Sequence, residues 1–164
     1  QMIWCFFIGI GFGQIFDLDY FKIFGGKEIK RIVCGDDFHL SLDILKKHIK
    51  IGSGFSPQSE QIRFLFEIIL EMEYDKQLLF FQFITGNSRL PVGGLAAIYP
   101  PLTVARRVAD DQYINEDEPL PTVLTCTHYF KLPAYSTKEI MRNKLMIAIA
   151  DGATNFSLSW IHFN

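Results

Sequence analysis

The stretch that decides the fold is residues 80–94, which read FFQFITGNSRLPVGG. It opens on a run that is apolar nearly all round, so we expect the end of a buried helix that begins near Lys76. Gly86 stands where a residue in the left-handed conformation ends a helix. The glycines, asparagine and proline of residues 86–94 then predict a turn-rich structural connector.

Upstream of this stretch, the sequence predicts short helices and one flexible link. Residues 27–34 have the pattern of a helix stopped by a glycine, and Ser41 can cap a second helix. Residues 51–54 hold two glycines in four positions and are the candidate hinge. Ser56 and Pro57 then predict a helix start. The core-facing stripe of that helix would be Ile62, Leu65, Phe66 and Ile69.

Downstream, short strands and one long helix are predicted around a single cysteine, Cys126. The expected strands lie at residues 102–108, 123–124, 128–132 and 156–159. Ser136 and Glu139 have the spacing of a capping box, and the helix that they begin is expected to stop at Gly152. Helices outside a small sheet make the second part of the chain, from about residue 52, an α/β or α+β domain.

The composition limits the classes of protein and of partner. The 164 residues are 49% hydrophobic and 21% charged, which is typical of a globular domain and excludes a disordered or collagen-like chain. Sixteen basic and eighteen acidic residues leave a formal charge of −2, so we expect no nucleic acid as partner. The apolar residues 2–12 are fewer than the ~20 of a membrane span and follow no basic segment, so we expect no membrane and no secretory signal.

The three cysteines Cys5, Cys34 and Cys126 are spaced too widely for a disulfide framework or a metal site. We therefore expect no metal and a reducing compartment, the cytoplasm or the nucleus. Cys126 alone lies in polar company between two expected strands, where a thiolate could act as a nucleophile on a bulky partner. The alternative is a buried cysteine that packs as a small hydrophobic side chain.

His128 lies two residues after Cys126. On an extended chain the two side chains would share a face, as a cysteine–histidine hydrolase would require. The alternative is a strand histidine that faces solvent or its neighbours. Composition and spacing leave both interpretations open.

Residues 80–94 also carry a resemblance to a family. They strongly resemble the HECT-type ubiquitin ligases, and the likeness extends over about residues 11–159. Further matching motifs are Leu120-Pro121, Thr125-Cys126, Leu132-Pro133, Tyr135-Ser136 and Ala148-Ile149. The chain also resembles the subgroup of this family that acts in ubiquitin-fusion degradation. Two motifs carry that likeness, Pro100-Pro101-Leu102-Thr103 and Lys131-Leu132-Pro133.

The resemblance implies an α+β fold, a HECT C-lobe with a small sheet flanked by helices, preceded by a short helical remnant of the N-lobe. Residues 1–49 would be that remnant, and residues 53–164 would be the C-lobe that bears the catalytic cysteine. The hinge between the lobes would consist of Lys50, Ile51 and Gly52, which overlap the glycine-rich link.

The resemblance also implies a two-step transfer of ubiquitin that uses no cofactor. Cys126 matches the nucleophile, which takes ubiquitin from a conjugating enzyme as a thioester and passes it to a lysine of a protein substrate. Thr125 matches the threonine before the nucleophile, and Phe156 matches the aromatic residue that helps to place the acceptor lysine. His128 stands where the family usually has asparagine.

Two departures from the family pattern are typical of a fragment. Most of the N-lobe, which docks the conjugating enzyme, is not in this sequence, so we expect the chain alone to be inactive with that enzyme. The sequence also continues past Ser159, where family members usually end. One alternative is a non-catalytic remnant that binds ubiquitin or another partner. Another is a hydrolase that cleaves ubiquitin conjugates with Cys126 and His128.

Overall fold

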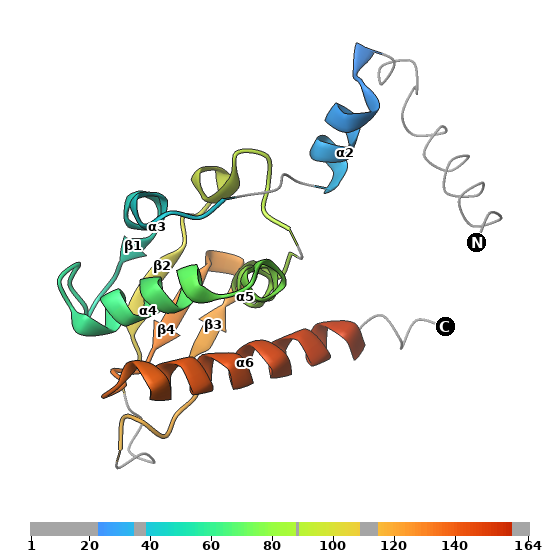
Figure 1. Cartoon of the computed structure of the whole chain (residues 1–164). Coiled ribbons are helices and arrows are strands. Elements are labelled where there is room, and N and C mark those ends of the chain that lie inside the picture. The colour runs from blue at the N-terminus through green and yellow to red at the C-terminus, as the bar shows by residue number, and fades with distance from the viewer. Residues whose placement is uncertain (1–22, 35–38, 88, 109–114, 159–164) are drawn as a thin grey trace. The chain divides into compact units, whose positions relative to one another are not determined.

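The computed structural model describes residues 23–34, 39–87, 89–108 and 115–158 (Figure 1). The chain divides into two compact units, Gln1–Gly35 and Asp36–Asn164. In the first unit, helix α2 (Gly26–Cys34) confirms the helix predicted at residues 27–34. Among the helices of the described ranges, none is long and apolar enough to cross a membrane.

The second unit is built on a four-stranded sheet. Its strands are β1 (Lys50–Ile51), β2 (Thr103–Arg106), β3 (Thr122–Leu124) and β4 (Tyr129–Leu132). They lie in the order β1-β2-β4-β3; β1, β2 and β4 are parallel, and β3 is antiparallel to β4. The three strands predicted between residues 102 and 132 are therefore confirmed, with small shifts in their bounds.

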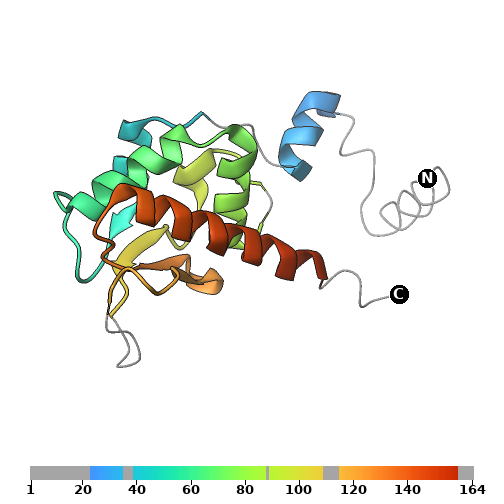
Figure 2. The ribbon, with the colours of Figure 1, turned by 60° about the horizontal axis from the view of Figure 1, so that its bottom comes forward.

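Helices pack on this sheet and on one another. They are α3 (Leu42–His48), α4 (Glu60–Glu71), α5 (Tyr74–Thr85) and α6 (Lys138–Leu158). Helix α4 lies across one face of the sheet in Figure 1, and α6 runs alongside both α4 and α5 in Figure 2. A small mixed sheet with packed helices confirms the predicted α+β fold.

The predicted caps at the start of α3 and at the end of α5 are both confirmed. Ser41 caps α3, because its Oγ accepts a hydrogen bond from the Ile44 N–H at 3.3 Å. Gly86 ends α5 in the left-handed conformation, with φ at 75°, and its N–H donates to the Gln82 carbonyl at 2.8 Å.

The core lies between the helices and the sheet. Phe130 of β4 is fully buried, and its ring meets those of Phe80 and Phe83 edge-on at centroid distances of 6.0 and 6.4 Å. The stripe predicted for α4 is buried, and so is the matching face of α6. Its members are Ile62, Leu65, Phe66, Ile69, Met141, Leu145, Ala148 and Ile149.

The helix start predicted at Ser56 and Pro57 is wrong. Helix α4 begins at Glu60, because Ser56 and Ser59 close a separate turn before it. The Ser56 N–H donates to Ser59 Oγ at 2.9 Å, and the Ser59 N–H donates to the Ser56 carbonyl at 3.0 Å.

The capping box predicted for Ser136 and Glu139 is also wrong. The Oγ1 of Thr137 accepts the hydrogen bond at the start of α6, from the Ile140 N–H at 3.3 Å. Ser136 is instead bound to the carboxylate of Asp117, which the chain brings in from a loop before β3.

The last helix is longer than predicted. Helix α6 continues through Gly152 to Leu158, so Phe156 lies in a helix and the strand expected at residues 156–159 is wrong. A Cβ atom at Gly152 would lie 2.6 Å from Cδ2 of Phe83 in α5. The glycine therefore marks the close approach of two helices rather than a helix end.

The residues predicted as the hinge lie inside the second unit. Lys50 and Ile51 form β1. The Lys50 N–H donates at 2.8 Å to the carbonyl of Leu102, just before β2, and the Gly52 N–H donates at 2.7 Å to the carbonyl of Val104 in β2. The compact units divide elsewhere, between Gly35 and Asp36. The assignment of the lobes and of the hinge stays a prediction.

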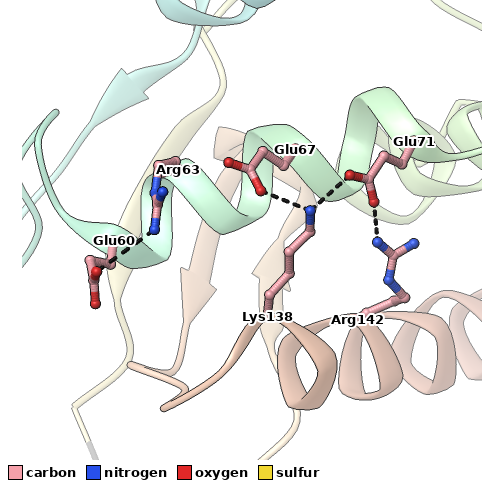
Figure 3. Close-up of polar contacts among 6 residues, drawn as sticks. All are labelled: Glu60, Arg63, Glu67, Glu71, Lys138 and Arg142. Carbon is pink, nitrogen blue, oxygen red and sulfur yellow. Dashed lines mark hydrogen bonds and ion pairs between the residues drawn. The ribbon is translucent and has the colours of Figure 1, made fainter.

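Four charged side chains join α4 to α6 (Figure 3): Glu67 and Glu71 come from α4, and Lys138 and Arg142 come from α6. Lys138 Nζ lies 2.7 Å from carboxylate oxygens of both Glu67 and Glu71, and Arg142 pairs with Glu71. Hydrogen bonds from Lys138 and Arg142 hold the pKa of Glu71 below its ordinary value, and those to Glu67 and Glu71 raise the pKa of Lys138. The four charges form a polar link at the edge of the α4–α6 packing.

Replacing Glu71 with glutamine should remove this link and lower the stability of the fold by an amount that depends on pH. A carboxyl whose pKa is lowered by folding stabilises the folded state above its unfolded pKa and loses that contribution as pH falls through the folded pKa. Glu71→Gln should therefore melt below wild type at pH 7, and the gap should close between about pH 5 and pH 3. Thermal denaturation of the 164-residue chain measures this. The matched control is Glu60→Gln, since Glu60 pairs with Arg63 of the same helix at 3.7 Å. Equal decreases in melting temperature for both variants would contradict a stabilising link between α4 and α6.

Candidate active site around Cys126

Cys126 lies at the middle of a 3-10 turn, η3 (Thr125–Thr127), which joins β3 to β4. Its side chain is exposed and its thiol is free. The turn stands at the end of two neighbouring antiparallel strands, where a large partner can approach the sulfur from solvent. The alternative of a cysteine buried in the core is therefore wrong.

His128 follows the turn in the left-handed conformation, with φ at 50° and ψ at 40°. A non-glycine residue rarely adopts this conformation, and histidine is one of the types that tolerates it. The His128 N–H donates to the Thr125 carbonyl at 3.3 Å and closes η3. Its own carbonyl accepts from the Thr103 N–H of β2 at 3.0 Å.

The imidazole of His128 is bound to the backbone. Its Nδ1 lies 2.7 Å from the carbonyl oxygen of Pro100. A carbonyl can only accept a hydrogen bond, so we assign the proton of this contact to Nδ1. The ring thereby ties the end of η3 to the segment that leads into β2.

The prediction that Cys126 and His128 share one face of an extended strand is wrong. The 3-10 turn and the left-handed backbone of His128 break the two-residue alternation on which that prediction depended. The geometry gives His128 a part in fixing the turn, and Thr125 takes part by accepting the bond that closes it.

The sequence of this unit and of its surroundings matches a known family. Residues 7–159 fit the family model described as HECT-domain (ubiquitin-transferase). The chain belongs to the HECT family. This assignment confirms the resemblance carried by residues 80–94.

The relatives of this HECT chain indicate its subgroup within the family. It is 40% identical over 149 residues to E3 ubiquitin-protein ligase UPL4 of Arabidopsis thaliana and 40% identical over 151 residues to E3 ubiquitin-protein ligase TRIP12 of Danio rerio. It is 35% identical over 149 residues to ubiquitin fusion degradation protein 4 of Saccharomyces cerevisiae. The predicted likeness to the ubiquitin-fusion-degradation subgroup is confirmed. Each match covers 91% of this chain but only 10%, 7% and 10% of the respective relative.

Two exposed apolar side chains adjoin residues of this turn or of its hydrogen-bonded neighbour Pro100. Leu124, the last residue of β3, is 52% exposed and lies two positions before Cys126. Tyr99 is 90% exposed and precedes Pro100, whose carbonyl binds His128. Both side chains are therefore open to solvent in segments that border the turn of Cys126.

The other predicted site residues lie apart from this turn in the sequence. Phe156 lies in the last part of α6, where the structure describes the backbone but not the surroundings of the side chain. Among the described residues, no group of three or more histidine, cysteine or acidic side chains could hold a metal ion. Sequence reasoning missed Pro100, because a backbone carbonyl leaves no signal in the residue type.

Proposed function

We propose that Cys126 accepts ubiquitin from a conjugating enzyme as a thioester and passes it to a lysine of a protein substrate. One observation carries the proposal: the residue at the position of the family's nucleophile is a free thiol exposed on a turn. The family description, a ubiquitin transferase, supports the class of reaction. Because the chain spans about a tenth of its relatives, the activity of the whole protein is part of the proposal.

The first step exchanges one thioester for another. The Cys126 thiolate attacks the carbonyl carbon at the end of ubiquitin, a new carbon–sulfur bond forms, and the thiolate of the conjugating enzyme leaves. In the second step the amine of a substrate lysine attacks the same carbon and loses a proton, and the Cys126 thiolate leaves. The first step breaks one thioester and forms another of similar energy, so the main task of the protein is to position the thiol.

The local geometry supports this task. Hydrogen bonds of Thr125 and His128 close the turn, and His128 ties it to β2 and to Pro100. The proposal also keeps a hinge at Lys50, Ile51 and Gly52 and the docking of the conjugating enzyme on an N-lobe. Because a free thiol persists in reducing compartments, we place the reaction in the cytoplasm or the nucleus.

A ubiquitin thioester of a small thiol tests the first step without a conjugating enzyme. We expect the 164-residue chain to form an adduct that reductant removes, and peptide mass analysis to map it to Cys126. An adduct formed equally on Cys5 or Cys34, or none at all, would overturn the proposal. Binding of ubiquitin without an adduct would favour the non-catalytic remnant. Repeated release of a fluorogenic ubiquitin ester would favour the hydrolase.

Phe156→Ala should separate the two steps of the reaction. The family position of Phe156 implies a role in placing the acceptor lysine, so thioester formation should stay within about twofold of wild type while transfer to lysine falls roughly tenfold. Single-turnover discharge of the charged protein onto free lysine measures the second step. Ile147→Ala, on the exposed face of α6, is the control. Equal losses in both steps would mean that Phe156 only stabilises the fold.

A further inference from the structure

The segment that leads into β3 is held by side chains rather than by strand pairing. It consists of residues 117–120, here called the approach segment, and it precedes Pro121 and the edge strand β3. Pro119 and Pro121 have no N–H to offer a sheet ladder, so the segment cannot continue the pairing of β3 with β4. Since β3 has only three residues, the position of the following turn depends on what holds this segment.

Each residue of the approach segment accepts a hydrogen bond from elsewhere in the unit. The contacts are Ser136 N–H and Oγ to the Asp117 carboxylate, both at 2.7 Å, Lys144 Nζ to the Glu118 carbonyl at 2.7 Å, Tyr135 Oη to the Pro119 carbonyl at 2.7 Å, and an Arg107 guanidinium N–H to the Leu120 carbonyl. The donors come from three places: the residue after β2, the link before α6, and α6 itself. The segment is therefore tied to both the sheet and the last helix.

Tyr135 makes the most buried of these bonds. Its side chain is fully buried and Pro119 is buried as well. Burial raises the pKa of the Tyr135 hydroxyl above its ordinary value, so the hydroxyl remains a donor at neutral pH. A buried carbonyl without a hydrogen-bond donor is costly, and the Tyr135 hydroxyl supplies the donor to the Pro119 carbonyl.

Lys144 and Asp117 hold the exposed end of the segment. Lys144 reaches the Glu118 carbonyl from the second turn of α6. Asp117 accepts two bonds from Ser136, and these bonds hold the pKa of its carboxyl below the ordinary value. The carboxylate therefore stays ionised, and the contact persists, at neutral pH.

We infer that Tyr135 and Lys144 are positioning residues, which fix Cys126 by holding the approach segment on one side of β3 while His128 holds the turn on the other. The inference rests on the proposed function of Cys126. If the reaction is mainly a matter of placing a thiol, a loosened approach segment should slow the exchange without weakening the binding of ubiquitin.

Two sets of variants test the inference. Tyr135→Phe removes one hydroxyl from the core, and Tyr129→Phe removes a hydroxyl from β4 as the matched control. Lys144→Met removes the donor to Glu118, and Lys144→Arg restores one. The readouts are the maximal rate and the half-saturating concentration for thioester formation from the small-thiol ubiquitin thioester, and hydrogen exchange of residues 115–127.

Tyr135→Phe should lower the maximal rate roughly tenfold at an unchanged half-saturating concentration, and it should speed exchange at residues 115–127 but not in α4. Lys144→Met should cause a smaller loss, about threefold, which Lys144→Arg restores. Tyr129→Phe should behave as wild type.

Rates within twofold of wild type for both Tyr135→Phe and Lys144→Met would overturn the inference. If Tyr135→Phe fails to fold, the two Lys144 variants still decide the question, because Lys144 lies outside the core. Failure of the proposed function gives a different result: wild type would form no thioester, while hydrogen exchange would still respond to the variants.

Discussion

Cys126→Ala should abolish ubiquitin transfer, with a loss of about a thousandfold or more in thioester formation. Alanine has no nucleophilic atom, and the other two residues of the exposed turn, Thr125 and Thr127, carry no thiol. The proposed loading step uses a conjugating enzyme docked on an N-lobe, so the measurement uses a chimera in which residues 7–159 replace the matching part of the TRIP12 ligase of Danio rerio. The readout is the amount of reductant-sensitive ubiquitin adduct after charging by a conjugating enzyme.

Three further substitutions separate the chemistry of Cys126 from its packing. Cys126→Ser should give a slow adduct that survives reductant, because an oxygen ester replaces the thioester. Cys5→Ala and Cys34→Ala should charge as wild type does. Equal amounts of reductant-sensitive adduct in wild type and in Cys126→Ala would end the transfer hypothesis.

Phe130→Ala should cause the largest loss of stability, about 3–5 kcal/mol in the free energy of unfolding. Phe130 is fully buried in β4, which pairs on both sides, with β2 and with β3. Its ring lies edge-on to those of Phe80 and Phe83, so truncation leaves a cavity where α5 meets the sheet. Urea unfolding of the 164-residue chain, followed by circular dichroism, measures the loss.

Phe130→Leu is the matched control, since leucine keeps most of the apolar volume and should cost about half as much or less. A loss below about 1 kcal/mol for Phe130→Ala would contradict a packed core at this position. The urea dependence should keep its slope in both variants, because the surface exposed on unfolding hardly changes.

Much of the fold follows from local signals. The stripe of α4 repeats every three or four residues, and Gly86 lacks the Cβ that disfavours a left-handed helix end. Ser41 accepts the bond that its residue type predicts. The turn that presents Cys126 was also predictable, because Thr125, Cys126 and Thr127 interrupt two β-rich stretches. Family motifs then supplied the candidate role of the cysteine.

Other features depend on residues that lie far apart in the sequence. Ser136 fits a capping box by spacing, but its N–H and hydroxyl bind the carboxylate of Asp117, nineteen positions away in the sequence. Thr137 therefore accepts the hydrogen bond at the start of α6. His128 fits an extended strand, but the carbonyl of Pro100 binds its ring and the backbone turns left-handed.

The sequence by itself determined the family, the helical stripes and the cysteine on a turn, because each is encoded in residues that are neighbours along the chain. The tertiary structure decided that Gly152 lies inside a helix, where the close approach of Phe83 leaves no room for a side chain. It also decided what holds the approach segment, because backbone carbonyls take their partners from whichever side chains folding brings near them.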